Sequence, residues 1–283
     1  MTSVDRFLIV NGDDFGRSEA VNAGVAKAFR EGVLTSASIV ANGPAFGSAV
    51  ALAGELDGLG LGIHLALNEY EPVLPPSEIP SLVTQDGKFR RRGQQFLTMI
   101  ISPRTRDEIF REWDAQISKV LAAGINLEHI DGHGHCHAHP RVGSVIVGLA
   151  ERYGISHVRL PVESLGWRPE RRSASRLLQK IALNSFALCS RQLWGKRLSC
   201  PQYFYGFSDG GHLSTSVVRR VARGVRPGVS ELMVHVGTSN VESAGLKTAF
   251  DRKADLDAVT SFDKPSFEKE FDVKLVSHTG RRP

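Results

Sequence analysis

The sequence predicts an α/β fold in which parallel strands are joined by helices. Short apolar runs alternate with amphipathic helical patterns along most of the 283 residues, and no internal repeat is visible. This alternation is typical of a parallel sheet with helical crossovers, either doubly wound or closed into a (β/α) barrel. A single barrel domain commonly has roughly 200 to 300 residues. We therefore expect one domain over residues 1–283.

The N-terminal quarter supplies the first strands and helices of this pattern. Residues 7–10 predict a strand, and residues 18–31, which a glycine follows, predict a helix. Residues 36–41 and 59–67 predict two further strands, and a helix that begins near Pro44 separates them. Two strand–helix units and a third strand are therefore expected here.

An apolar stripe predicts a helix at residues 105–124. The stripe consists of Ile109, Trp113, Ile117, Val120 and Leu121. Thr105 and Glu108 have the spacing of a capping box, so we expect the helix to begin at Thr105. Strands at 129–131, 157–160 and 230–235 and a helix at 140–153 continue the alternation.

Two long segments interrupt the alternation and are interpreted as lid insertions. Residues 68–104 contain the proline-rich run 72–76 and the basic run 90–92, and they predict a long loop over the site. Residues 163–211 combine many arginines and lysines with apolar residues. They predict either a surface helix with its apolar side on the barrel or a face for a lipid or an anionic membrane surface.

Composition restricts the class of protein only weakly. The net charge of +5 and the pI near 9.2 are mildly basic, and the arginines form no recognised nucleic-acid motif, so we expect no nucleic acid as a partner. Cys136, Cys189 and Cys200 are scattered and odd in number, which predicts reduced thiols. The N-terminal apolar run is too short for a signal peptide or a membrane span, so a cytoplasmic protein is expected.

Two adjacent carboxylates follow the first predicted strand. Asp13 and Asp14 would emerge at the carboxyl end of that strand, where α/β enzymes gather their reactive groups. Because neighbouring carboxylates repel, the pair suits one metal ligand beside one general base. Taken by itself, the pair would be better explained by an ordinary aspartate-rich turn that caps the next helix.

Histidines provide the second signal. His64 lies inside an otherwise apolar strand, where an imidazole needs a partner. Four histidines alternate directly after the strand at 129–131, and strand geometry would place them on one side. Of these, His133 is the leading candidate for a metal ligand, His135 and His137 are candidates for substrate contacts, and His139 is the weakest candidate.

Two further candidates lie at the ends of predicted strands. His235 ends the strand at 230–235, where an imidazole could donate a proton to a leaving group or only form hydrogen bonds. Arg159 lies in the strand at 157–160, where it could hold a substrate oxygen or orient a carboxylate.

Taken together, these motifs resemble the YdjC-like carbohydrate deacetylases over nearly the whole chain. The resemblance rests on four motifs in order: Asp13-Asp14-Phe15-Gly16, Gly62-Ile63-His64-Leu65, Asp131-x-His133-x-His135-x-His137 and Glu231-Leu232-Met233-x-His235. It implies a deformed, TIM-barrel-like (β/α) barrel with one divalent cation. The implied ligands of the cation are Asp14, His64 and His133. The resemblance also implies that Asp13 is the catalytic base and that His235 is an acid or a substrate contact.

Residues 73–82 and 86–90 resemble the hopanoid-biosynthesis-associated branch of this family, which would make the substrate a sugar-bearing lipid. The chain departs from the family pattern at Gly12, Gly132, Gly134 and Val236. These departures spare the implied ligands and bear on the support around them.

The expected activity is removal of the acetyl group from an N-acetylated sugar or glycolipid. Asp13 would take a proton from water, His235 would protonate the departing amine, and Arg159, His135 and His137 would contact the substrate. The ligand set favours zinc, with magnesium, manganese, cobalt and nickel as alternatives. A homodimer and peripheral contact with the inner face of the membrane remain open. The rival functions are a metal-dependent phosphoesterase and a non-catalytic carbohydrate- or metal-binding module.

Overall fold

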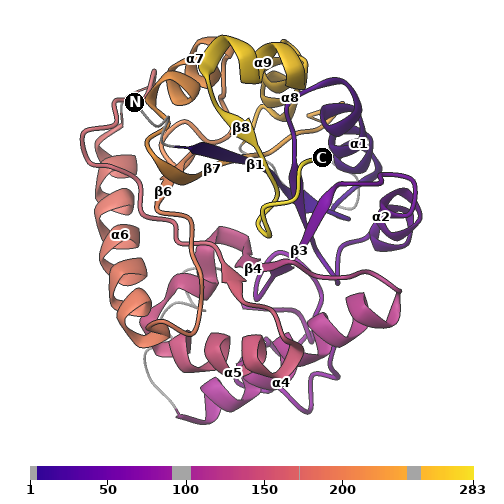
Figure 1. Ribbon diagram of the computed structural model, residues 1–283. Helices are drawn as coiled ribbons and strands as arrows, with labels where there is room; N and C mark the ends of the chain where they lie inside the picture. Colours follow the sequence, from indigo (N-terminus) through magenta and orange to yellow (C-terminus); the bar gives the residue numbers. More distant parts are fainter. Residues whose placement is uncertain (1–4, 91–102, 172, 241–249) are drawn as a thin grey trace.

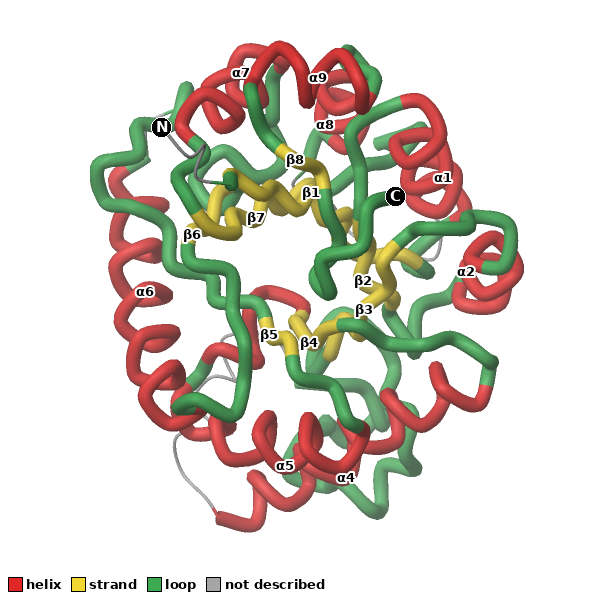
Figure 2. The backbone as a smooth tube through the Cα atoms, in the orientation of Figure 1, coloured by secondary structure: helices red, strands yellow, loops and turns green. Residues whose placement is uncertain are grey.

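Parallel strands curl around a central axis and helices surround them, as expected for a deformed (β/α) barrel (Figures 1 and 2). The computed structural model describes residues 5–90, 103–171, 173–240 and 250–283. All the pairings between strands in these ranges are parallel. The strand order is β5-β4-β3-β2-β1-β7-β6, and β8 pairs with β1 beside this path.

The strands are short except for the first. Their bounds are β1 Arg6–Phe15, β2 Ser36–Ile39, β3 Gly60–Leu65, β4 His129–Gly132, β5 His157–Val158, β6 Tyr203–Tyr205, β7 Gly228–Val234 and β8 Lys274–Leu275. Between the β5 and β6 sides, the described residues pair only through two isolated bridges, His157 with Ser199 and Glu163 with Phe204. The barrel is therefore deformed on that side.

The helices lie outside the ring of strands (Figure 2). Their bounds are α1 Glu19–Glu31, α2 Phe46–Ala53, α4 Pro103–Ala122, α5 Gly143–Tyr153, α6 Ala174–Trp194, α7 Thr215–Gly224, α8 Arg252–Thr260 and α9 Lys264–Phe271, with two 3-10 helices, η1 His133–Ala138 and η2 Pro140–Val142. Apolar side chains such as Leu34, Trp113 and Ile146 are fully buried in the main hydrophobic core. This apolar layer holds the strand ends, and with them the site, in place.

The structure corrects two expectations about local conformation. Helix α4 begins at Pro103, so Thr105 lies within its first turn rather than at its N-cap. Glu108 instead accepts hydrogen bonds from the backbone N–H and the hydroxyl of Ser81, at 2.7 and 3.0 Å. The histidines after β4 lie in 3-10 turns interrupted by a kink rather than in an extended strand. Gly134 and His135 form the kink, because both adopt positive φ angles near 60°, which are neither extended nor right-handed helical.

The two segments interpreted as lids differ in the structure. Residues 68–90 contain no helix or strand, and the rest of that segment up to residue 102, with Arg91 and Arg92, lies outside the described residues. Residues 163–211 contain α6 and β6, so this segment contributes a strand to the ring and a helix to its outer layer. Arg172 lies outside the described residues.

Candidate active site

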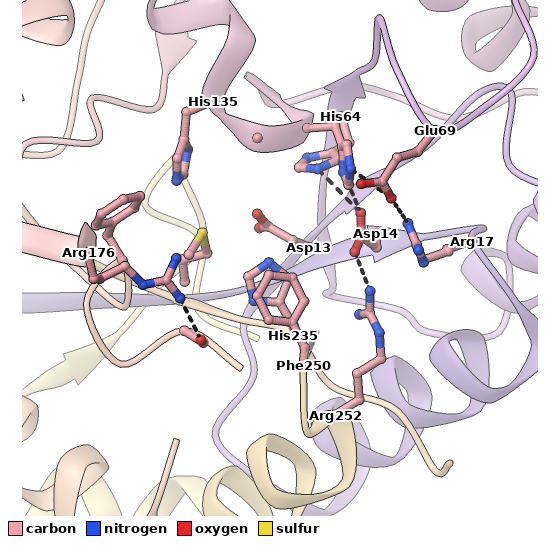
Figure 3. A pocket seen from close by; sticks show the side chains of 15 residues that line it. Asp13, Asp14, Arg17, His64, Glu69, His135, Arg176, His235, Phe250 and Arg252 are labelled. Atoms are coloured by element: carbon pink, nitrogen blue, oxygen red, sulfur yellow. Dashed lines mark hydrogen bonds and ion pairs between the residues drawn. The ribbon is translucent and has the colours of Figure 1, made fainter. Parts of the chain in front are cut away.

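The carboxyl end of β1 brings both aspartates to one pocket. In a regular strand the side chains of neighbouring residues point to opposite faces. Asp14, however, has a φ of 72°, in the left-handed region that non-glycine residues rarely adopt. The side chains of Asp13 and Asp14 consequently both line the pocket (Figure 3). Such backbone strain persists only where the surrounding structure enforces it, and it is common at functional sites.

Asp14, His64 and His133 come together as a group that could hold a metal ion. One ligand atom from each lies within 4.8 Å of the others. The Asp14 Oδ1 atom is 3.0 Å from His133 Nδ1 and 3.6 Å from His64 Nε2. The implied ligand set thus converges, although its members come from β1, β3 and the start of η1.

Other side chains hold two of these ligands in orientation. His64 Nδ1 lies 2.8 Å from Asp131 Oδ1, which leaves His64 Nε2 directed toward Asp14. Arg252 donates to Asp14 Oδ2 at 2.6 Å, which leaves Oδ1 facing the histidines. Partners of this kind fix the ring or carboxylate of a metal ligand.

The electrostatics of the group favour a cation. Although burial opposes its charged form, the guanidinium of Arg252 and the imidazole of His133 hold the pKa of Asp14 well below its usual range. Burial also opposes charge on His133, but Asp14 and Glu69 raise the pKa of His133 to about 9. His133 therefore carries a proton near pH 7 when no metal is bound. A divalent ion at this position would displace that proton and supply the positive charge in its place. The donor set of one carboxylate and two imidazoles fits a divalent metal ion.

Asp13 lies beside this group and has a separate counter-charge. Arg159 donates to both carboxylate oxygens of Asp13, at 2.6 and 2.7 Å. Asn11 donates to Asp13 Oδ1 at 2.9 Å. Because these bonds fix the carboxylate and it still lines the pocket, Asp13 is placed to accept a proton from a molecule bound there.

Arg159 and His137 were expected to contact substrate, and both lie away from the pocket lining. Arg159 is fully buried and also binds Glu231 Oε1 at 2.7 Å and Asp131 Oδ2 at 2.9 Å. These contacts are those expected of an arginine that orients carboxylates. His137 is fully buried, stacks on Trp194 and lies 3.0 Å from the backbone oxygen of Arg159 through Nε2. The turn at Gly134 and His135 directs it into the barrel wall.

His135 and His235 both line the pocket. Figure 3 shows His135 with Arg176 on the side opposite His64 and Glu69. His235 stacks on Phe250 with ring centroids 4.1 Å apart, and burial lowers the pKa of His235 to about 4. His235 is therefore neutral near pH 7 in the absence of a ligand.

The pocket includes side chains that sequence reasoning missed. Its volume is about 190 Å³, and Arg17, Glu69, Phe250 and Arg252 are among its lining residues. Arg17 binds Glu69 at 3.1 Å, which ties the loop after β3 to the end of β1. Only Arg17 had a signal in the sequence, since it directly follows the motif Asp13-Asp14-Phe15-Gly16.

Known proteins resemble the chain in sequence and fold. It is 47% identical over 154 residues to a carbohydrate deacetylase of Brevibacillus brevis, covering 54% of this chain and 59% of that protein. It is 43% identical over 157 residues to a carbohydrate deacetylase of Geobacillus stearothermophilus, covering 56% and 59%. The matches thus span somewhat over half the length of these relatives.

A solved structure from Enterococcus faecalis V583, whose description names cellobiose-phosphate cleavage, superposes with a TM-score of 0.74. The superposition covers 97% of this chain and 98% of that chain, at 25% sequence identity. The family model described as YdjC-like protein matches residues 7–270, which include every residue of the candidate site. The chain therefore belongs to the YdjC-like protein family.

Proposed function

We propose that the chain is a hydrolase that removes the acetyl group from an N-acetylated sugar, with one divalent ion held by Asp14, His64 and His133. The observation that carries the proposal is the pairing of two adjacent carboxylates with different partners. Asp14 faces two imidazoles, whereas Asp13 is fixed by Arg159 and faces the pocket. The names of the Brevibacillus and Geobacillus relatives support the same activity.

A bound zinc ion would act as a Lewis acid toward the acetamide carbonyl and toward water, whose pKa it can lower to about 7. Asp13 accepts the proton of the attacking water, because its carboxylate is held at the pocket by Arg159 and Asn11. Arg159 keeps its own charge at a fixed distance from Asp13 throughout, so the carboxylate need not move between steps. His135 contributes a substrate contact from the other side of the pocket.

For His235 the low pKa favours one of its two expected roles. A pKa of about 4 leaves very little imidazolium near pH 7. We therefore assign His235 to a hydrogen bond with the substrate and assign proton delivery to the amine to the protonated Asp13 carboxyl. In that scheme the proton that Asp13 takes from water passes to the departing nitrogen, and atoms and charge balance.

The phosphoesterase alternative is favoured where clustered Asp and His residues hold two cations. The other group of ligand atoms in the described residues consists of Asp13, His64 and Asp131. Arg159 already lies 2.6 Å from Asp13 and 2.9 Å from Asp131, so a second divalent ion would meet a fixed positive charge. This charge favours the one-ion reaction.

The experiment is acetate release by the metal-reconstituted protein from chitooligosaccharides, simple N-acetylglucosamine glycosides and a lipid-linked glycoside. A matched assay with aryl phosphates uses the same preparations. Release from chitooligosaccharides would support a general sugar deacetylase, and release only from the lipid-linked compound would support the hopanoid branch. Phosphate release without acetate release would contradict the proposal, and so would the absence of turnover in a protein that binds metal.

A further inference from the structure

The outer face of α6 exposes an apolar stripe, which we define as Leu177, Leu178, Ile181 and Leu188. Five of the seven exposed large hydrophobic side chains in the described residues lie on this helix. Leu178 is 68% exposed and Leu188 is 51% exposed. Because Leu177, Ile181 and Leu188 are spaced by four and seven residues, they share one helix face.

The opposite face attaches α6 to the barrel without help from the stripe. Trp194 and Ala187 are fully buried, and the Ser190 hydroxyl donates to the backbone oxygen of Ala138 at 3.0 Å. Lys180 forms an ion pair with Glu163 at 3.3 Å. Figure 1 shows α6 along one flank, with its other side turned away from the ring of strands. These contacts hold α6 on the barrel from the side opposite the stripe.

The segment around the stripe carries charge of one sign. Residues 171–208 contain no aspartate or glutamate, and their basic residues are Arg171, Arg172, Arg176, Lys180, Arg191, Lys196 and Arg197. Lys196 and Arg197 are exposed just beyond the C-terminal end of α6, and Arg171 is exposed just before its N-terminal end. Arg197 lies 3.7 Å from the exposed carboxylate of Glu151, in a solvent-exposed ion pair. An apolar stripe with basic residues at both ends matches the chemistry of an anionic bilayer surface.

We infer that α6 docks the protein on an anionic membrane surface, with the apolar stripe in the headgroup region and the basic residues on anionic lipids. A second copy of the chain fits less well, because a two-fold contact of this face would bring basic segments together with no acidic residue in either. In the described ranges, no helix is long and apolar enough to cross a membrane.

Docking would bring the candidate active site close to the bilayer. Arg176, in the first turn of α6, lines the pocket and donates to the backbone oxygen of Gly210 at 3.1 Å. The rim of the pocket therefore continues directly into the docking helix. The inference concerns binding and does not depend on the proposed deacetylation.

The experiment is co-sedimentation of the full chain with phosphatidylcholine vesicles, with and without a quarter phosphatidylglycerol. We expect binding to the anionic vesicles at low salt, and much weaker binding near 1 M salt, where the Debye length is about 3 Å. The triple variant Leu177→Ser, Ile181→Ser, Leu188→Ser should weaken binding at least about tenfold. Leu121→Ser, on an exposed position of α4, is the matched apolar control and should bind normally.

Charge is tested with a second pair of variants. The double variant Lys196→Gln, Arg197→Gln should weaken binding to anionic vesicles. The control Lys253→Gln, Lys269→Gln, at two exposed positions, should leave binding unchanged. Circular dichroism checks that every variant is folded. Equal binding to neutral and anionic vesicles, no binding to either, or normal binding by the stripe variant would overturn the inference. A stripe variant that turns a dimer into a monomer with unchanged vesicle binding would assign the face to a second copy.

Discussion

The mouth of the barrel buries charged groups, whereas the outer face of α6 exposes apolar ones. Asp13, Asp14 and Arg159 are almost completely buried, while Leu178 on α6 is 68% exposed. Each arrangement opposes the usual distribution of residues in a folded protein. At the mouth, the unfavourable burial is offset by pairing, since every one of these charges has a partner within 3 Å. On α6, the described residues leave the apolar side chains of the stripe exposed.

The difference indicates where function and stability coincide. Removing a charge at the mouth should affect both folding and turnover, because the same contacts hold the pocket and balance the buried charge. Removing an apolar group from the stripe should affect neither, because the exposed face contributes little to the folded state.

The largest expected effect is that of Asp13→Asn on turnover. The amide cannot accept the proton of the attacking water, so we expect acetate release to fall by roughly a thousandfold. Metal content should stay at the wild-type level, because the ligands are Asp14, His64 and His133. A variant with near-normal turnover would remove Asp13 from the mechanism.

Arg159→Met tests the buried charges directly. The variant leaves Asp13, Asp131 and Glu231 without their shared cation, and breaking a buried pair of this kind costs about 3–5 kcal/mol. Urea denaturation measures the loss. Arg197→Met is the matched control, because Arg197 is exposed and its contact with Glu151 at 3.7 Å should contribute at most about 1 kcal/mol. Equal losses in the two variants would contradict the assigned role of Arg159.

Glu231→Gln should change how stability depends on pH. Burial opposes its charge, but Arg159 lowers the pKa of Glu231 from 4.5 to about 2. A lowered pKa in the folded state stabilises the protein above pH 4.5, and the stabilisation is lost as the pH falls toward 2. The wild type should therefore exceed the variant in free energy of unfolding most above pH 4.5, and the gap should shrink in acid. A gap that widens in acid would contradict this coupling.

The smallest expected effect is that of Leu178→Ser. We expect the free energy of unfolding to change by less than about 0.5 kcal/mol, because the side chain is exposed. Trp194→Ala on the buried face of the same helix should cost about 3–5 kcal/mol. Thermal and urea denaturation of the two variants compare the faces, and a large loss for Leu178→Ser would show that the stripe is part of the core.

The sequence predicted those parts of the site that depend on strand ends. Asp13, Asp14 and His64 follow or lie in apolar runs, and parallel strands bring their carboxyl ends to one rim. His133 was predicted for the same reason. His137, which was expected to contact substrate, lies outside the pocket lining, because positive φ angles at Gly134 and His135 interrupt the alternation.

Contacts between distant residues could not be predicted in the same way. Arg252 binds Asp14 across 238 positions of sequence, and Arg159 binds Asp13 across 146. The sequence alone does not distinguish a buried arginine from an exposed one. The ion-pair partner of a buried arginine is therefore known only when the fold is known. The exposed stripe of α6 was one of two interpretations of residues 163–211, and the helix in fact has both a packed face and an exposed one.

The central claim is that one ion held by Asp14, His64 and His133 is required for deacetylation, and metal titration with acetate release measured at each step tests it most directly. The metal-stripped chain should be inactive, and activity should rise in proportion to bound zinc until one ion per chain. His64→Ala and His133→Ala should each fail to bind the ion and to recover activity. Turnover by the stripped chain, or two ions per chain at full activity, would contradict the account.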